Sequence, residues 1–262
     1  MLDIKQIQSY YPPFLQGKDK LKYLLREYMQ YHSLQFLSNT KYARDLCFIG
    51  GTNLRMVHGI SRFSEDLDFD INNMDRSAFV AMTDSLVNYI NKTGIKAVVE
   101  DREKELKLKA FRRNIVLPGF LQEHRVSAIK EEKFLIKIEC QNQGVQYTSK
   151  TTLISGCGTL FQFPVPPDDV LCSMKLSALL SRRKGRDFYD AIFLLSKTKP
   201  NYGFLKERQN IATGKELKKQ LIKTIEETNL SLKAQDFKDL IFEPEENKKI
   251  LFFREFVEQY DF

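Results

Sequence analysis

The chain has 262 residues, of which 42% are hydrophobic and 29% charged, so it can bury the core of one large domain or two smaller ones. It has neither a run of about 18 apolar residues nor a basic N-terminus followed by an apolar stretch. We therefore expect no membrane span, no membrane partner and no secretory signal, which favours a cytoplasmic protein. The formal net charge of +7 indicates an anionic partner such as a nucleotide or nucleic acid, or only an ordinary basic surface.

Helices and strands are both predicted in the first part of the chain. Apolar residues at helical spacing predict a helix over residues 18–38. A short apolar run predicts a strand over residues 44–49 that enters a tight turn at Gly50-Gly51, and strict alternation predicts another strand over residues 66–71. The other elements expected here are helices over about 52–58 and 75–92 and strands over about 95–101, 105–113 and 133–140.

The remainder of the chain has a helical pattern. The stretch from Pro164 to Pro167 breaks regular structure, so we expect a domain boundary there. Helices are expected over about 168–182, 186–197, 203–210, 214–228, 234–241 and 246–259. The sequence thus predicts an α+β protein, with a mixed sheet and helices in residues 1–165 and a helical C-terminal domain in residues 166–262.

Residues 48–70 carry the most chemical information, because a strand, a glycine turn, a short helix and a second strand follow one another. Asp66 and Asp68 are two residues apart on the second strand, so their side chains project from the same face. Neighbouring carboxylates repel each other unless a cation lies between them, which makes this pair a candidate seat for Mg²⁺ bound also to phosphate oxygens. The turn at Gly50-Gly51 and the helix N-terminus after it suit the close approach of a phosphate.

Two motifs, GGTNLRMVHGISRFSEDLDFDI at residues 50–71 and KLSALLSRRKGRDFYD at residues 175–190, resemble the signatures of the AbiEii/AbiGii nucleotidyltransferase toxins. In that family G-G-T/S, L-R and R-F-S/T-x-D-L-D-F recur in this order, and a K…R-x-x-R-D-x-x-D motif follows downstream. Two motifs in the right order carry more weight than one. The resemblance implies the DNA polymerase beta-like superfold, which transfers a nucleoside monophosphate from an NTP with the help of a carboxylate-bound metal.

The resemblance also implies roles for residues of the first motif. Asp66 and Asp68 would hold the metal, Mg²⁺ or Mn²⁺, and an NTP would be the substrate. The residues implied to bind the nucleotide are Gly50, Gly51, Thr52, Arg55, Arg62 and Ser64. For Ser64 a second interpretation, as a modification site, stays open.

The superfold usually needs a third carboxylate on a nearby strand. Glu139 is our candidate, because it shares one face of the segment FLIKIEC with Leu135 and Lys137. As a metal ligand it could also accept the proton of the attacking hydroxyl. The alternative interpretation is a solvated surface of lysine and glutamate, and Asp70 is the second candidate ligand.

The second motif offers charged residues on predicted helices. Lys175 falls near an apolar stripe, so it either contacts nucleotide phosphates in a pocket or extends along the domain boundary to solvent. Asp187 and Asp190 share a helix face and need cationic partners there, or they cap the helix. With the resemblance, Lys175 and Asp187 become candidate catalytic residues, and Lys175, Arg186 and Asp190 candidate nucleotide-binding residues.

The implied reaction is in-line transfer to an acceptor hydroxyl, with one metal activating the acceptor and a second steadying the pyrophosphate. Members of the resembled family are toxins of abortive-infection or toxin–antitoxin systems, and some add nucleotides to the 3′ end of tRNA. The resemblance therefore implies an RNA acceptor, the tRNA 3′ end, and an antitoxin protein as a partner. Three alternatives stay open: nucleotidylation of a protein or small molecule, a kinase-like phosphotransferase, and a non-catalytic homologue that binds nucleic acid or an antitoxin.

Overall fold

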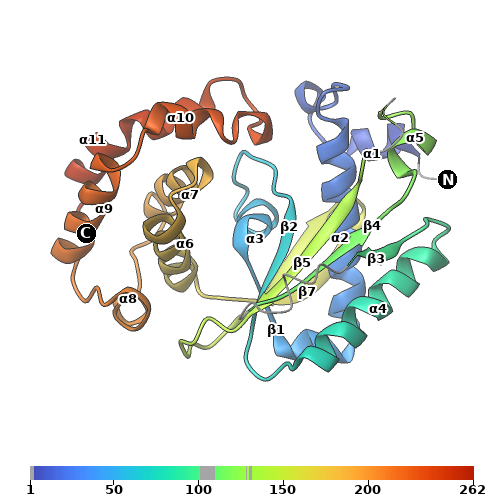
Figure 1. Ribbon diagram of the computed structural model, residues 1–262, viewed down its shortest axis with the longest axis horizontal. Coiled ribbons are helices and arrows are strands. Elements are labelled where there is room, and N and C mark those ends of the chain that lie inside the picture. The colour runs from blue at the N-terminus through green and yellow to red at the C-terminus, as the bar shows by residue number, and fades with distance from the viewer. Residues whose placement is uncertain (1–2, 101–109, 128, 130–131) are drawn as a thin grey trace. The chain divides into compact units, whose positions relative to one another are not determined.

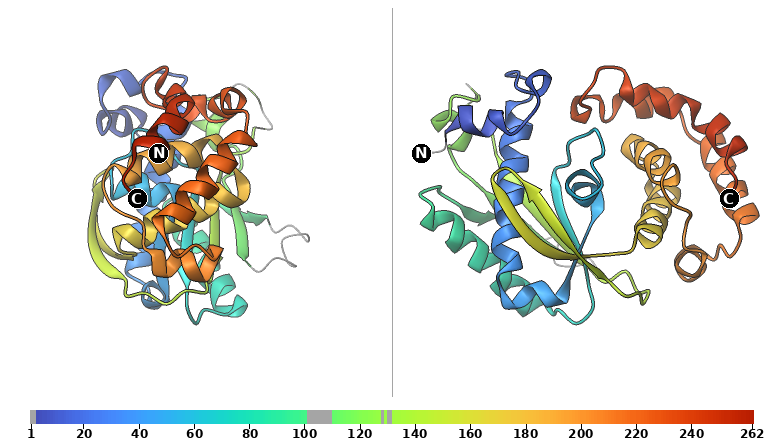
Figure 2. Two further views of the ribbon diagram at one scale, coloured as in Figure 1. Left: turned by 90° about the vertical axis from the view of Figure 1, so that its left-hand side faces the viewer. Right: turned by 180° about the vertical axis from the view of Figure 1, so that it is seen from behind.

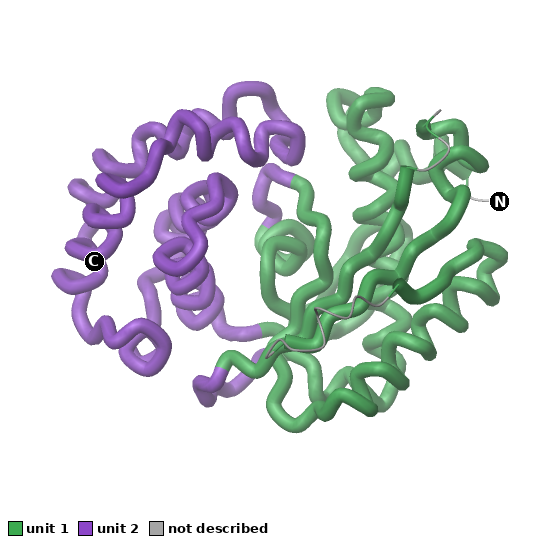
Figure 3. Tube along the Cα trace, viewed as in Figure 1, with its two compact units in different colours: residues 1–58, 63–143, 151–165 green, residues 59–62, 144–150, 166–262 purple. Residues whose placement is uncertain are grey.

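The computed structural model describes residues 3–100, 110–127, 129 and 132–262. The chain divides into two compact units, shown in different colours in Figure 3. Unit 1 comprises residues 1–58, 63–143 and 151–165, and unit 2 comprises residues 59–62, 144–150 and 166–262. The long C-terminal part of unit 2 starts at Pro166, beside the expected boundary. Residues 59–62 and 144–150, which lie within the first predicted domain, also belong to unit 2.

Unit 1 is built on a five-stranded mixed sheet with the strand order β1-β2-β5-β4-β3 (Figure 1). Its strands are β1 (Leu46–Ile49), β2 (Asp66–Ile71), β3 (Val98–Glu100), β4 (Phe111–Val116) and β5 (Leu135–Gln141). Strands β2 and β5 run parallel, and the other neighbouring pairs run antiparallel. The strand expected over residues 105–113 lies partly outside the described residues, and β4 starts at Phe111.

A second sheet was missing from the predicted elements. It consists of β6 (Lys150–Gly156) and β7 (Thr159–Val165). In β7 buried and exposed residues alternate, as in a strand with one covered face, although the segment contains Pro164. This proline lies one residue before the end of the strand, where it is tolerated.

The helices of unit 1 include the two long ones that were expected. They are α1 (Ile4–Ser9), η1 (Pro13–Leu15), α2 (Leu21–Ser38), η2 (Lys41–Asp45), α3 (Gly50–Met56), α4 (Arg76–Lys92) and α5 (Phe120–Glu123). Helix α4 begins where the sequence predicted, because the Asp75 side chain accepts a hydrogen bond from the main-chain N–H of Ala78. Seen from behind, α2 and α4 run beside the five-stranded sheet (Figure 2).

One face of this sheet packs against α4. Phe111 of β4 stacks on Phe79 of α4 with 5.6 Å between ring centroids, and Arg113 of β4 forms an ion pair with Asp84 of α4. Ile138 of β5 pairs with Arg113 in register and therefore lies on the same face. Residues at the alternate positions of β4, β5 and β2 lie on the opposite face, which α4 does not cover.

The core on the α4 side is largely aromatic. Phe48 of β1, Phe69 of β2 and Phe163 of β7 are buried, with ring centroids 5.8 to 6.2 Å apart. Aromatic pairs at such distances add packing energy to the burial of apolar surface. The missed hairpin is thus part of the core of unit 1.

Unit 2 is helical, as expected, but its last elements differ from the predicted ones. Its helices are α6 (Asp168–Arg182), α7 (Gly185–Leu195), α8 (Tyr202–Gln209), α9 (Gly214–Glu226), α10 (Leu230–Gln235), η4 (Lys238–Leu240), η5 (Glu246–Phe252) and α11 (Phe253–Gln259). The helix predicted over residues 234–241 is wrong, because Asn229 caps α10 through the N–H of Leu232 and starts that helix earlier. None of the described helices is both long and apolar enough to cross a membrane.

Candidate active site

Charged side chains of β2 and β5 lie together on the face of the sheet that α4 does not cover. Asp66 and Asp68 of β2 share that face by strand alternation. In the parallel ladder Asp66 pairs with Lys137 of β5, and Asp68 pairs with Glu139. Residues in register on neighbouring strands project to the same side, so the four form one group. We call these residues, Asp66, Asp68, Lys137 and Glu139, the carboxylate face.

Cationic side chains already contact two of the carboxylates. The Lys137 Nζ atom lies 3.3 Å from Asp66 Oδ2 and 3.4 Å from Glu139 Oε2. Arg112 of β4 binds both oxygens of Glu139, with Nε to Oε2 at 2.7 Å and Nη2 to Oε1 at 2.9 Å. The Glu139 carboxylate is therefore held by two cations in this structure.

These contacts keep both Glu139 and Lys137 charged. Burial raises the pKa of Glu139, but the hydrogen bonds from Arg112 and the charge of Lys137 outweigh it and hold that pKa below its ordinary value. Burial lowers the pKa of Lys137, but the charges of Asp66 and Glu139 outweigh it and raise that pKa. Near neutral pH the carboxylate face thus combines the ionised Glu139 carboxylate with the Lys137 ammonium group.

The glycine turn lies directly against the carboxylate face. Gly50 has a φ of +83°, in the left-handed region. A Cβ at Gly50 would lie 2.8 Å from Cβ and Cγ of Asp68 and would overlap its Oδ2. The register of β1 with β2, in which Ile49 pairs with Asp68, holds the turn at this place. Glycine is required both by the backbone conformation and by the nearness of the carboxylate.

The start of α3 is fastened to the strands on either side of it. The Thr52 hydroxyl donates a hydrogen bond to the main-chain oxygen of Asp66, and Asn53 Nδ2 donates to the main-chain oxygen of Phe48 at 2.7 Å. Thr52 is buried, and this hydrogen bond directs its hydroxyl to the protein. The implied contact of Gly50, Gly51 and Thr52 with a triphosphate stays a prediction, in which main-chain N–H groups are the donors.

Arg55 and Ser64 connect the site to α2. Arg55 binds the carboxylate of Glu27 through Nε at 2.9 Å and Nη2 at 3.1 Å, and Glu27 is only 2% exposed. The main-chain oxygen of Ser64 accepts a hydrogen bond from Gln30 Nε2 at 3.3 Å. Arg55 would have to leave a buried carboxylate to reach a phosphate, so its implied role in nucleotide binding stays a prediction. Asp70, the second candidate ligand, accepts a hydrogen bond from the main-chain N–H of Gln143 at 2.9 Å.

Unit 2 contains three of the other candidates in one buried ion cluster. Arg62 binds Asp190 with two hydrogen bonds of 2.7 Å, and Lys175 Nζ lies 2.9 Å from Asp190 Oδ2. Asp190 is 0% exposed. Burial raises the pKa of Asp190, but the charges of Arg62 and Lys175 lower it to about 2. The sequence did not pair Arg62 with either residue, because 128 positions separate it from Asp190.

Asp187 contributes to the N-terminal capping of α7, as one of its two interpretations predicted. Its side chain accepts a hydrogen bond from the main-chain N–H of Lys184 at 3.1 Å, at the start of α7. Arg182 binds the same carboxylate, with Nη2 to Oδ1 at 2.7 Å. Asp187 is fully buried, whereas Arg186 is partly exposed. Catalytic or nucleotide-binding roles for Asp187 and Arg186 stay predictions.

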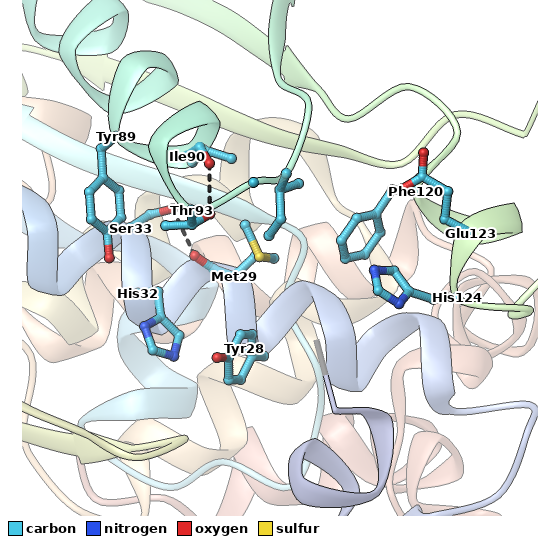
Figure 4. Close-up of a pocket in the computed structure, with 12 residues that line it drawn as sticks. Tyr28, Met29, His32, Ser33, Tyr89, Ile90, Thr93, Phe120, Glu123 and His124 are labelled. Carbon is cyan, nitrogen blue, oxygen red and sulfur yellow. Dashed lines mark hydrogen bonds between the residues drawn. The ribbon is translucent and has the colours of Figure 1, made fainter. Parts of the chain in front are cut away.

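A cavity of about 480 Å³ opens elsewhere in unit 1, among α2, the end of α4 and α5 (Figure 4). Its lining includes the rings of Tyr28, Tyr89 and Phe120 and two histidines, His32 and His124. Burial lowers the pKa of both histidines, which favours their neutral form. None of the site residues predicted from the sequence lines this cavity, which is bordered by the helix that covers the other face of the sheet.

The donor set of the carboxylate face fits a divalent ion only in part. Across the described ranges, no three His, Cys, Asp or Glu side chains are grouped so that they could hold a metal ion. Asp66 and Asp68 supply carboxylate oxygens, and the Asp68 carboxylate packs directly against the backbone of Gly50. Such a pair suits Mg²⁺ if phosphate and water oxygens complete its coordination.

Replacing Gly50 with alanine is expected to lower the free energy of unfolding more than replacing Gly94. Both residues have left-handed backbones, with φ of +83° and +86°, so both variants bear a cost of about 1–2 kcal/mol. Only at Gly50 does a Cβ meet other atoms, which adds about 1–3 kcal/mol of overpacking. Urea denaturation of the two variants measures the difference, and equal losses would contradict the contact between the turn and Asp68.

Replacing Asp190 with asparagine is expected to lower the free energy of unfolding by about 3–5 kcal/mol, because two buried cations lose their counter-charge. The pKa of Asp190 is lower in the folded protein, about 2 against 3.8, so ionisation stabilises the fold above pH 4 and this contribution disappears as the pH falls toward 2. Denaturation across that range should show a shallower decline for Asp190→Asn than for the wild type. Asp236→Asn removes only a surface pair with Lys233 and serves as the control.

The chain is similar to known proteins both in sequence and in structure. The family model "Nucleotidyl transferase AbiEii toxin, Type IV TA system" matches residues 34–259. The structure is similar to MenT4, a nucleotidyltransferase toxin from Mycobacterium tuberculosis H37Rv, with 15% identity, a TM-score of 0.59 and coverage of 100% of this chain and 91% of that chain. It is also similar to JHP933 from Helicobacter pylori, with 17% identity, a TM-score of 0.55 and coverage of 90% of each chain. Comparison with curated proteins gives no match.

At these identities the two solved structures show the fold alone, and they confirm the predicted α+β fold. The family model carries the assignment further, because its match includes the glycine turn, the carboxylate face and the buried ion cluster of unit 2. The chain is a nucleotidyltransferase and belongs to the AbiEii toxin family of type IV toxin–antitoxin systems.

Proposed function

We propose that this enzyme transfers a nucleoside monophosphate from an NTP to a hydroxyl of RNA, at the 3′ end of tRNA, with a divalent ion held by Asp66 and Asp68. One observation carries the proposal: the Asp68 carboxylate lies against the left-handed turn at Gly50, on the same strand face as Asp66. A turn without a side chain and a pair of carboxylates together suit an ion-bound triphosphate.

Nucleotide and ion are proposed to bind together. The two carboxylates offer fewer oxygens than the octahedral shell of Mg²⁺ needs, and phosphate oxygens are its usual further ligands. When bound, Mg²⁺ or Mn²⁺ would neutralise charge on the phosphates and lower the pKa of the acceptor hydroxyl. Asp66 and Asp68 are the residues proposed to hold the ion, and the Gly50 turn, against which Asp68 packs, is proposed to receive the triphosphate through its main-chain N–H groups.

Glu139 is the proposed third carboxylate, with a condition that the structure adds. Both of its oxygens accept hydrogen bonds from Arg112, and one also contacts Lys137. To bind an ion or to accept the proton of the acceptor hydroxyl, an oxygen of Glu139 must exchange one of these cations. Its place beside Asp68 in register supports the proposal.

Residues of unit 2 are proposed to serve the nucleotide and the acceptor. Asp190 keeps Lys175 and Arg62 in fixed places, so Lys175 is the cation we propose for phosphate contact, and Asp190 acts through it. Arg186 and the neighbouring basic residues are proposed to contact phosphates, and the net charge of +7 supports an anionic acceptor. The family implies an antitoxin as a further partner.

Incubation with α-labelled NTPs, Mg²⁺ and total tRNA is expected to place label at RNA 3′ ends, and EDTA should abolish the transfer. Asp66→Ala and Asp68→Ala should each lower the rate at least about 100-fold, because the ion that binds the phosphates loses a carboxylate ligand. Asp236→Ala, which removes only the surface pair with Lys233, should keep wild-type activity. Scintillation counting of gel-resolved RNA measures all three.

The same experiment separates the alternatives. Label that enters protein but not RNA would establish protein nucleotidylation and contradict the RNA acceptor. Transfer of a γ-label would indicate a phosphotransferase. Activity or toxicity that persists unchanged in both aspartate variants would contradict catalysis by the carboxylate face.

A further inference from the structure

Lys137 belongs to the carboxylate face, yet neither sequence motif contains it and the proposed reaction does not use it. The residue is on β5, where it pairs with Asp66, and Glu139 two positions later pairs with Asp68. Its side chain is 28% exposed, and its Nζ atom bridges Asp66 and Glu139 at 3.3 and 3.4 Å. The ammonium group is therefore an ion-paired component of the site and not a fully solvated surface charge.

This ammonium group lies between two carboxylates, where it can supply the positive charge that a second ion supplies in a two-metal site. In such sites two ions about 3.5–4 Å apart stabilise the attacking and leaving oxygens of the reaction. On the carboxylate face, the gap between a β2 carboxylate and Glu139 is where a second ion would bind. Lys137 Nζ already lies there and contacts both groups.

Two further observations limit room for a second ion. Arg112 binds both oxygens of Glu139, so a protein cation already neutralises this carboxylate. In the part of the chain that the structure describes, no three His, Cys, Asp or Glu side chains form a group that could hold a metal ion. Asp66, Asp68 and Glu139 are therefore not such a group. A divalent ion next to the ammonium would also be repelled at short range.

We propose that the Lys137 ammonium replaces the second metal ion, so that this enzyme binds a single divalent ion, on Asp66 and Asp68 together with the nucleotide. The proposal rests on the proposed function for the nucleotide and for that one ion. Lys137 then supplies the positive charge on the side of Glu139, where the acceptor hydroxyl is expected. It acts as a positioning residue, because it holds Asp66 and Glu139 in place and fixes how many ions the site accepts.

The test counts ions directly and needs no turnover. Equilibrium dialysis with Mn²⁺ and non-hydrolysable α,β-methylene analogues of the four NTPs gives the number of Mn²⁺ ions per protein-bound nucleotide. The wild type is expected to bind one ion, and Lys137→Met, which keeps the chain length without the charge, is expected to bind two. Lys137→Arg should return the count to one, because it restores a cation.

Lys133→Met is the matched control, because Lys133 lies just before β5, has 59% of its side chain exposed and pairs with Glu100 on the surface at 2.9 Å. It should bind one ion. Two ions in the wild type would overturn the proposal without any variant, and so would an unchanged single ion in folded Lys137→Met. Circular dichroism of each variant verifies the fold.

Failure of the proposed function gives a different result. If the wild type takes up none of the four analogues with Mn²⁺, the carboxylate face is not a nucleotide site, and the proposed function fails with the inference. If two ions bind while α-label still reaches RNA, only the role of Lys137 is overturned.

Discussion

Repulsion among carboxylates on neighbouring strands is the constraint on which this site depends. Asp66, Asp68 and Glu139 are brought to one face by the parallel register of β2 and β5, and the strands cannot separate them without losing their ladder. Ionised groups this close are stable only with positive charge among them. Lys137 and Arg112 provide that charge within the protein, and the glycine turn packs against the Asp68 carboxylate.

In unit 2 a carboxylate is also compensated by cations, but in the protein interior and not at a partly solvated surface. There a single carboxylate, Asp190, is removed from water entirely and is compensated by two cations from distant parts of the sequence. A buried pair with complete partners is no large source of stability, but the loss of one partner is costly. The cluster therefore gives Lys175 a defined charge and place, whereas the carboxylate face keeps its groups partly in contact with solvent and able to exchange partners.

Local patterns predicted much of the framework of the site and few of its contacts. The alternation of DLDFDI placed Asp66 and Asp68 on one face of a strand, and Asp75 marked the start of a helix. Contacts that depend on strand order could not be predicted. Lys137 approaches Asp66 because β5 lies beside β2, and the sequence of neither strand specifies this neighbour. The hairpin β6–β7 was missed because Pro164 suggested a break in a segment whose alternation is that of a strand. Pairing across 128 residues left Arg62 without an assigned partner.

The interleaving of the two units has a consequence for how the enzyme is made. Residues 59–62 are synthesised early, between α3 and β2, but they belong to a unit whose main part begins only at Pro166. Arg62 therefore leaves the ribosome long before Asp190 exists, and a nascent chain that stops short of α7 lacks the carboxylate that binds Arg62 in the folded protein. A translation product interrupted at Pro166 would carry the carboxylate face but not Lys175, so incomplete copies of this toxin-family enzyme are missing one of their proposed phosphate ligands.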